Sequence, residues 1–248
     1  MRRRLEPEWL DELPAADPRA VRSRRDLGRI NALMGHASFV AGALRQLFPT
    51  QAPRRIVELG CGDGLFAWRV ARRVAGIWPG VEVIGVDQAP CVAAPTRERF
   101  QDLGWSFKFV EADIFDWLGR NETGPIDAVV ANLFLHHFPE PELRQMFAAV
   151  ASRGSAMVAC EPRRSLWALG ASRLLGLIGC NDVTRHDAVI SVRAGFAAEE
   201  LSRFWPGEPG WELSERPHGS FSHLFVARPA GAVSRERRRP QALRTTHE

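Results

Sequence analysis

The segment Gly60-Cys61-Gly62-Asp63-Gly64 of this 248-residue chain has the residue types and spacing that point most directly to chemistry. It follows a short apolar strand candidate, residues 55–57, and precedes a helical stretch over residues 65–74. Glycines allow a sharp turn and a close approach of the backbone to a ligand, and the following helix presents unpaired N–H groups there. With the acidic Glu58 two places before the turn, this pattern predicts a site for a nucleoside-bearing cofactor.

The spacing of the glycines indicates the class of cofactor. A dinucleotide fingerprint, Gly-x-Gly-x-x-Gly, needs its third glycine at position 65, which is Leu65 in this chain. The third glycine comes one residue earlier, at Gly64. The pattern therefore disfavours NAD.

Two further acidic residues follow strand candidates. Residues 83–86 lead to Asp87, at the separation where a carboxylate can accept both hydroxyls of a ribose. Residues 107–112 lead to Asp113 at the tip of a third strand. Either aspartate alone could be a helix cap or a turn residue. Three acidic strand tips in this order favour a cofactor site instead.

This series resembles class I S-adenosylmethionine-dependent methyltransferases, whose first motif the Glu58-to-Gly64 segment matches. The resemblance implies S-adenosylmethionine as cofactor and S-adenosylhomocysteine as its product. In that family the acidic residue at the third tip accepts a hydrogen bond from the adenine amino group, and its apolar neighbour packs beside the ring. The expected cofactor-binding residues are Glu58, Gly60, Cys61, Gly62, Asp87, Gln88, Asp113, Ile114, Asn132 and Leu133.

Strand and helix patterns alternate from about residue 54 to residue 162. Strands are expected to end near Glu58, Asp87, Asp113, Asn132 and Glu161, with helices over 65–74, 94–103 and 141–151. Such alternation predicts a doubly wound α/β domain with a mostly parallel sheet, whose ligands lie beyond the carboxyl ends of the strands. A helix over 166–178, a polar loop, a helix over 197–204 and strands over 211–216 and 223–228 follow. A terminal antiparallel hairpin and seven strands in all are typical of the class I methyltransferase fold.

Three regions are expected along the chain. Residues 1–50 contain a helix capped by Asp17, with an apolar stripe at Leu27, Ile30, Leu33 and Met34, and a second helix over 39–48. They are predicted to form a helical cap over the active site. Residues 51–230 form the methyltransferase domain, and the basic tail, residues 231–248, is predicted to be disordered.

Composition excludes several classes of protein. The net charge of +4 is a small difference between 33 basic and 29 acidic residues, which does not predict a nucleic-acid partner. Four cysteines without a Cys-x-x-Cys pair argue against a zinc site, any other metal site or a disulfide framework. The N-terminus lacks a signal peptide, and the apolar run 166–178 is too short to span a bilayer. We therefore expect a cytoplasmic protein that acts on a small molecule, as a monomer or a homodimer.

The segment after the fourth strand, Asn132-Leu133-Phe134-Leu135-His136-His137, bears on the acceptor. It lacks the Asp/Asn-Pro-Pro-aromatic motif of adenine N6 enzymes and the Cys beside Pro of cytosine C5 enzymes. It resembles small-molecule enzymes, including the ubiquinone and menaquinone ring methyltransferases. His137 is a candidate base and His136 a candidate substrate contact, although in that family the pair is often structural.

A second candidate region is Arg185-His186-Asp187, within an expected polar loop over 181–187. A histidine beside a carboxylate can serve as a general base near neutral pH, so His186 and Asp187 are candidate catalytic residues. Asp187 could equally cap the next helix. Arg185 and Trp167 are candidate substrate contacts, the latter from an apolar stretch that could line a pocket.

Segments 22–27 and 186–196 together resemble bacterial methyltransferases associated with type III polyketide synthases. That resemblance implies a phenolic or polyketide acceptor, with methyl transfer to oxygen. Transfer to carbon of a quinol ring, a cofactor-binding protein without catalysis and a dehydrogenase are the alternatives.

Overall fold

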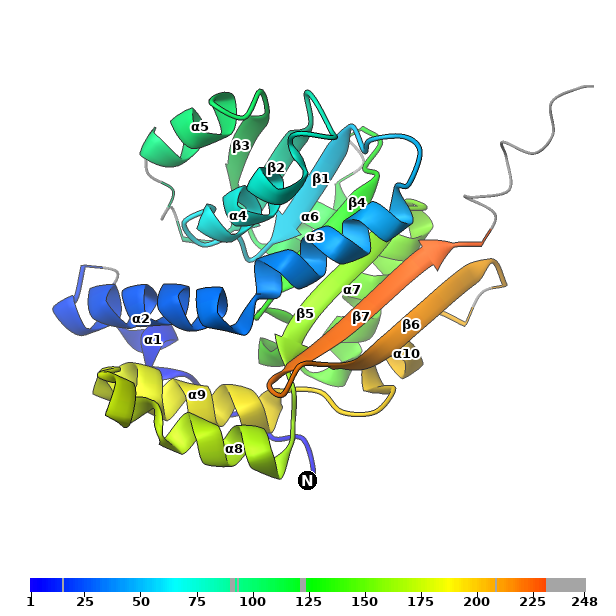
Figure 1. Ribbon diagram of the computed structural model, residues 1–248. Coiled ribbons are helices and arrows are strands. Elements are labelled where there is room, and N and C mark those ends of the chain that lie inside the picture. Colours follow the sequence, from blue (N-terminus) through cyan, green and yellow to red (C-terminus); the bar gives the residue numbers. More distant parts are fainter. Residues whose placement is uncertain (15, 90–91, 93, 121–123, 208, 231–248) are drawn as a thin grey trace, which may run out of the picture.

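The computed structural model describes residues 1–230 except 15, 90–91, 93, 121–123 and 208 (Figure 1). The predicted tail over residues 231–248 lies outside the described residues. The strands are β1 (Arg55–Leu59), β2 (Glu82–Asp87), β3 (Ser106–Glu111), β4 (Ala128–Asn132), β5 (Ala156–Pro162), β6 (Trp211–His218) and β7 (Ser222–Pro229). The α-helices are α1 (Trp9–Glu12), α2 (Pro18–Met34), α3 (His36–Leu47), α4 (Leu65–Val74), α5 (Ala94–Gln101), α6 (Ile114–Gly119), α7 (Glu140–Ser152), α8 (Leu166–Arg173), α9 (Asp182–Ala194) and α10 (Glu200–Phe204). Two 3₁₀ turns, η1 (Leu135–His137) and η2 (Leu175–Ile178), complete the described elements.

The seven strands form one sheet in the order β3-β2-β1-β4-β5-β7-β6, in which β7 runs antiparallel between β5 and β6. The inner parallel strands β1, β2, β4 and β5 are largely buried because helices cover both faces of the sheet, whereas the edge strand β3 exposes Ser106, Lys108 and Glu111. Ile56 and Val83 belong to the core under α3 and α4, whereas Val57 and Val129 belong to the core under α6 and α7. This confirms the doubly wound sheet with a terminal hairpin, which is the class I methyltransferase fold.

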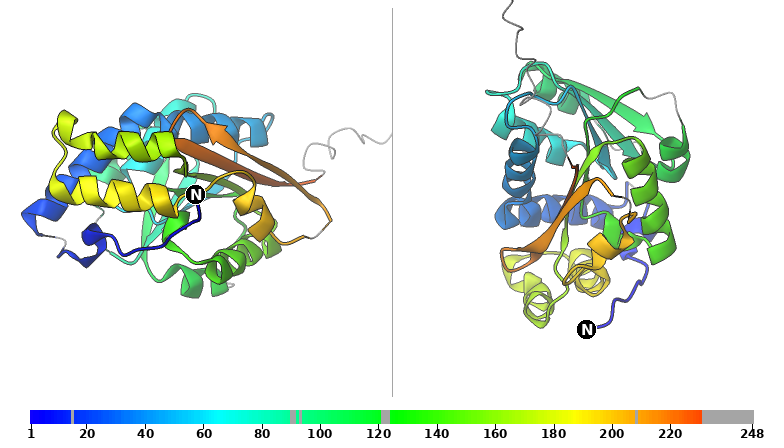
Figure 2. Two further views of the ribbon diagram at one scale, coloured as in Figure 1. Left: turned by 90° about the horizontal axis from the view of Figure 1, so that it is seen from below. Right: turned by 90° about the vertical axis from the view of Figure 1, so that its right-hand side faces the viewer.

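The helices α1, α2, α8 and α9 gather beyond the carboxyl ends of the parallel strands (Figures 1 and 2). Among them, α9 packs against α1, α2 and α8. In contrast, α3 contributes Val40 and Leu44 to the core on the sheet. Of residues 1–50, it is therefore α1 and α2 that lie at this edge, while the domain boundary at residue 50 stays a prediction.

Several expected boundaries were wrong. The polar loop over 181–187 is helical from Asp182 onward, because Asn181 accepts the Thr184 N–H at 2.9 Å and caps α9. The single helix expected over 166–178 is two elements in the structure. The α-helix α8 ends at Arg173, and the 3₁₀ turn η2 follows it. The predicted apolar stripe lies on α2, but the fully buried residues of this helix are Ala20, Ser23 and Asp26, and Leu33 is 79% exposed.

None of the helices in the described ranges is long and apolar enough to span a membrane.

Candidate active site

The glycine-rich turn joins β1 to α4 at the middle of the sheet edge. Gly60, Gly62 and Gly64 all have positive φ, at 67°, 52° and 74°, which is the conformation that glycine adopts without a steric penalty. A Cβ on Gly60 would lie 2.1 Å from the ring of Phe134, so this ring packs directly on the turn. A Cβ on Gly62 would meet no atom within 4 Å, so the space above the turn is open there.

Asp87 lies at the end of β2 and holds the turn. Its Oδ2 accepts the Gly62 N–H at 2.8 Å, and its Oδ1 accepts the Ala89 N–H at 3.0 Å. Each carboxylate oxygen can accept a further hydrogen bond. The structure thus brings Asp87, Gly60 and Gly62 together, as expected for one binding site.

Asp113 follows β3 and caps α6. Its Oδ1 accepts the N–H groups of Phe115 at 2.8 Å and Asp116 at 3.2 Å, so the capping role considered for this residue is real. Its Oδ2 accepts the side-chain N–H of Gln88 at 2.8 Å, which ties the tips of β2 and β3 together. Ile114 is buried beside it.

Glu58 and Cys61 are buried next to the turn. Glu58 lies beneath α4, against Phe66 and Val70, and its Oε2 has no hydrogen-bond partner among the described residues. Burial, together with the charges of Asp63 and Asp87, raises the pKa of Glu58 well above its usual range. Burial and the nearby carboxylates also raise the pKa of the Cys61 thiol, so the thiol carries no charge at neutral pH.

Asn132 and Leu133 carry the chain from β4 across the site. The Asn132 Oδ1 lies 2.8 Å from Nδ1 of the buried His36 on α3, whose Nε2 lies 2.7 Å from Ser222 Oγ. Leu133 has φ at 51°, a left-handed conformation that is costly for this residue type and occurs at functional sites. This turn places Phe134 on Gly60 and directs the next residues toward β5.

Glu161 at the end of β5 anchors η1. It is fully buried, and its Oε1 accepts the N–H groups of Phe134 at 3.1 Å and Leu135 at 3.0 Å. Its Oε2 lies 2.8 Å from Nδ1 of His136, which is also buried. Burial opposes the charge of Glu161, but these hydrogen bonds outweigh it and lower the pKa of the carboxyl group.

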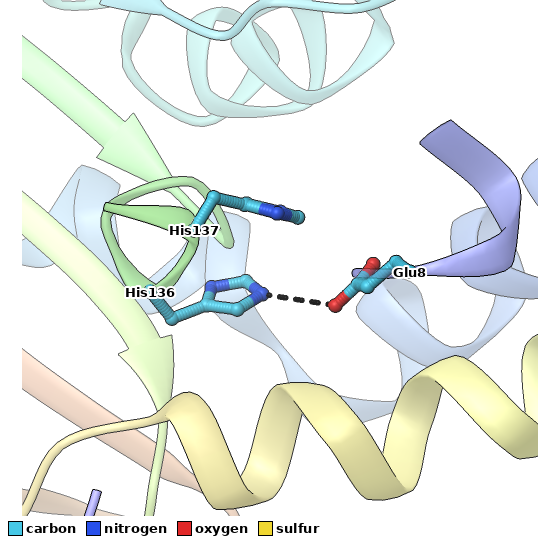
Figure 3. A group of neighbouring side chains, drawn as sticks. All are labelled: Glu8, His136 and His137. Carbon is cyan, nitrogen blue, oxygen red and sulfur yellow. Dashed lines mark ion pairs between the residues drawn. The ribbon is translucent and has the colours of Figure 1, made fainter. Parts of the chain in front are cut away.

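His136 and His137 point toward Glu8, which precedes α1 (Figure 3). The Nε2 of His136 lies 3.5 Å from Glu8 Oε1. Burial lowers the pKa of His136, but its two carboxylate partners outweigh burial and raise the pKa to about 9. Burial and the neighbouring charge of His136 lower the pKa of His137 to about 4. At neutral pH, His136 is therefore protonated and His137 is neutral.

Glu8, His136 and His137 place three possible metal ligands within 4.8 Å of one another, although no metal was expected from the sequence. Both nitrogens of His136 already face a carboxylate, with Glu161 on one side and Glu8 on the other. The hydrogen bonds and charges of the protein thus account for this cluster, and we assign no metal to it.

His186 and Asp187 form a second histidine–carboxylate pair, on α9. The Nδ1 of His186 lies 2.9 Å from Asp187 Oδ1, and the ring of Trp9 stacks on the imidazole at 3.7 Å. Asp187 is buried and accepts the N–H groups of Trp9 at 2.9 Å and Leu10 at 3.0 Å. It therefore caps α1, not the helix that follows it in sequence, and it orients His186.

The remaining predicted contacts, Arg185 and Trp167, lie on the surface. Arg185 is exposed on α9 and lies against Gly176. The side chain of Trp167 is 70% exposed on α8. The described contacts do not bring either residue to His186 or to the glycine-rich turn.

The first twelve residues, part of the predicted helical cap, contact α9 and the loop after η1. Arg3 donates from Nε to Ala194 O at 2.7 Å and from Nη2 to Phe138 O at 2.9 Å. Asp11 lies 3.6 Å from Nδ1 of His137. Although Asp11 faces solvent in part, the surrounding protein and the charges of Glu8, Asp187 and Asp87 raise its pKa to about 6. Asp11 thus lies within electrostatic range of Asp187 on α9 and of Asp87 at the end of β2.

Glu8, Trp9, Asp11 and Glu161 are thus site residues that sequence reasoning missed. The expected end of the fifth strand at Glu161 was the one available signal, because a carboxylate at a buried strand tip needs partners. The three residues near the N-terminus have no periodic pattern and no motif.

Comparisons with known proteins agree with this geometry. Residues 56–153 match the protein family described as a methyltransferase domain. Trans-aconitate 2-methyltransferase of Mycobacterium tuberculosis (strain ATCC 25177 / H37Ra) is 33% identical over 109 residues, which are 44% of this chain and 37% of that protein. The matched region thus spans little more than a third of that relative.

Solved structures share the fold at low sequence identity. The plantazolicin methyltransferase BpumL, in complex with SAH, has a TM-score of 0.60 and 11% identity, over 86% of this chain and 91% of that chain. The mitomycin 7-O-methyltransferase MmcR has a TM-score of 0.56 and 18% identity, over 89% of this chain and 60% of that chain. The family match covers β1–β4, the cofactor side of the site, and ends before α8 and α9.

Proposed function

We propose that this protein transfers a methyl group from S-adenosylmethionine to the oxygen of a small, largely apolar phenolic or polyketide-type acceptor. The observation that carries the cofactor assignment is the turn itself. Asp87 holds Gly62 at 2.8 Å beneath open space, at the carboxyl edge of a parallel sheet. The methyltransferase-domain match over residues 56–153 includes this turn.

The fit of the cofactor rests on atoms that remain available around the turn. Asp87 would accept the ribose hydroxyls and Asp113 the adenine amino group, since each carboxylate has lone pairs left beside its described hydrogen bonds. Ile114 would pack beside the adenine, and the Gly60–Gly62 backbone would face the amino-acid portion. Asn132 and Leu133 would close the site opposite the turn.

A thermal-shift experiment tests this assignment. A ligand that binds only the native protein raises the melting temperature by mass action. We expect a rise with S-adenosylmethionine and with S-adenosylhomocysteine, and none with NAD. No rise with either sulfur compound at saturating concentration would refute the proposal.

The acceptor side favours a neutral aromatic molecule. Near η1 and α9 the carboxylates of Glu8, Glu161 and Asp187 outnumber the cations His136 and Arg3, and this excess disfavours a polycarboxylate. Trp9 stacks on His186 and Phe134 packs on Gly60, so each part of the proposed site offers an aromatic surface. We therefore do not carry over the acceptor named for the trans-aconitate enzymes.

His186 is the proposed base. Asp187 fixes its Nδ1, which leaves Nε2 to accept the proton of a phenol. When bound, S-adenosylmethionine would supply an electrophilic methyl carbon, and His186 would generate the phenolate that accepts the methyl group. His136 is protonated and cannot serve as a base, and a pKa of about 4 makes His137 a weak one. Loss of turnover in His137→Ala with full activity in His186→Ala would move the base to η1.

Carbon methylation of a quinol ring is the second candidate, because its acceptor also needs a phenolate in an apolar site. Mass spectrometry of the product made with a labelled methyl group distinguishes the two, since an aryl ether and a ring methyl fragment differently. A protein that binds the cofactor and leaves it intact with every phenol and quinol tested would be a binding protein instead. We also propose a cytoplasmic location.

A further inference from the structure

The outer face of α8 and η2 exposes large apolar side chains. Five residues between positions 166 and 178 are between 59% and 83% exposed, and we call them the outer apolar face: Leu166, Trp167, Leu174, Leu177 and Ile178. The opposite side of α8 buries Ala168 and Ser172, and α8 packs on α9. A contiguous apolar surface of this kind on a soluble fold marks an interaction site.

Arginines border the outer apolar face. Arg22 donates to Gly179 O at 3.1 Å, Arg185 lies against Gly176, and Arg173 is exposed at the end of α8. Among the described residues, none of these three forms an ion pair with a carboxylate. The two nearby acids are engaged elsewhere, since Asp26 pairs with Arg29 at 3.7 Å and Asp182 with Arg19 at 2.8 Å. The border of the apolar face thus carries an excess of positive charge.

We propose that the outer apolar face docks on the surface of an anionic lipid bilayer. A short amphipathic helix with Trp and Leu on one face and arginines beside it binds at the interface of lipid and water. There the apolar side chains enter the headgroup boundary while the arginines attract anionic headgroups. A second copy of this chain fits less well, because a two-fold contact would bring the same arginines face to face.

Docking would place the helix that carries His186 next to the bilayer, since α8 packs on α9. This consequence rests on the proposed function: a lipophilic phenol dissolved in the membrane would then lie close to the acceptor side. The docking itself requires no activity, so it can be tested separately.

The experiment is co-sedimentation of the whole protein with vesicles. We expect binding to vesicles of phosphatidylglycerol and phosphatidylcholine, and weaker binding to phosphatidylcholine alone. Leu177→Asp should lower the partition coefficient about tenfold or more, because it removes an exposed apolar side chain that would enter the bilayer and adds a charge that anionic headgroups repel. Ile77→Asp is the matched control, since Ile77 is also exposed but follows α4. Both variants should keep the melting temperature and its rise with S-adenosylmethionine.

Three outcomes would overturn the proposal. The first is no binding to the anionic vesicles. The second is that Leu177→Asp and Ile77→Asp bind the vesicles equally, whether both keep binding or both lose it. Any binding would then be due to other parts of the chain, such as the arginines of residues 235–239. The third is a stable dimer in analytical ultracentrifugation that Leu177→Asp disperses, which would make the face a protein interface. None of these outcomes bears on cofactor binding.

Discussion

Glu161→Gln tests how far the acceptor side depends on one buried carboxylate. The two oxygens of Glu161 accept two backbone N–H groups of η1 at 3.0–3.1 Å and hold Nδ1 of His136 at 2.8 Å. Glutamine keeps the shape but replaces one oxygen with an NH₂ group, which cannot accept these hydrogens. In the less costly arrangement, the amide oxygen stays on the backbone, and His136 keeps Glu8 but loses Glu161, the nearer of its two carboxylate partners. Breaking a buried pair in this way should lower the free energy of unfolding by about 3 kcal/mol or more.

The effect should depend on pH in a defined direction. The pKa of His136 is about 9 in the folded protein, above its ordinary value of 6.5. Its stabilising contribution is therefore fully present below pH 6.5 and is lost as the pH rises through 9. Glu161 has a lowered pKa, so its contribution is present above its ordinary value and is lost at more acidic pH. Urea denaturation across this range should show a decline in wild-type stability toward alkaline pH and a flatter profile in Glu161→Gln.

Glu215→Gln is the matched control. Glu215 lies 2.7 Å from Nε2 of His223 and accepts the backbone N–H groups of Leu201 and Ser202, far from the glycine-rich turn. It should also lose stability, but its methyl-transfer rate should stay close to the wild-type value. A Glu161→Gln protein within 1 kcal/mol of wild type would refute the reasoning, because one broken buried pair should cost about 3 kcal/mol or more.

Three further substitutions test the proposed roles. His186→Ala should lower the methylation rate about 10²-fold or more without weakening cofactor binding. The loss of rate should shrink as the assay pH approaches the pKa of the acceptor, because the acceptor is then already ionised. Full activity of His186→Ala would mean that no base is needed. Asp87→Ala should weaken cofactor binding by about 1–3 kcal/mol in calorimetry, and unchanged affinity would contradict its role. Gly60→Ala should abolish the thermal shift with cofactor because its Cβ meets Phe134, whereas Gly80→Ala, also at positive φ but without a neighbour within 4 Å, should preserve it.

The fold around the glycine-rich turn was largely predictable because its signals are local, while cofactor binding there stays a prediction. Alternating apolar strands and a glycine turn specify β1, β2 and their connection, and the structure places Asp87 on Gly62. The third tip shows the limit of this reasoning. Asp113 is a helix cap as well as a cofactor candidate. Both roles call for an aspartate at the end of a strand, so the sequence cannot distinguish them.

The acceptor side was not predictable in the same way because distant segments build it. Residues 182–187 resemble a loop by composition, yet Asp187 and Thr184 are buried, with partners on α1 and α2. The four-residue helix α1 has no periodic pattern, and contacts across the chain hold it. Trp167 was predicted to line a pocket because the stretch 166–178 around it is apolar. The sequence of this stretch does not show which side of the helix faces the protein and which faces solvent.

The capping of α1 by Asp187 has a consequence for the order of assembly on the ribosome. The strands from β1 to β4 are neighbours in the sheet and lie within one continuous stretch of the chain, so they can pair as soon as that stretch has emerged. Trp9 must wait for Asp187, which is synthesised 178 residues later. Contacts between residues so far apart in sequence form late, because the chain must first lose the entropy of closing the loop between them. Trp9 leaves the ribosome before the strands of the sheet and is therefore among the last residues to reach its final place.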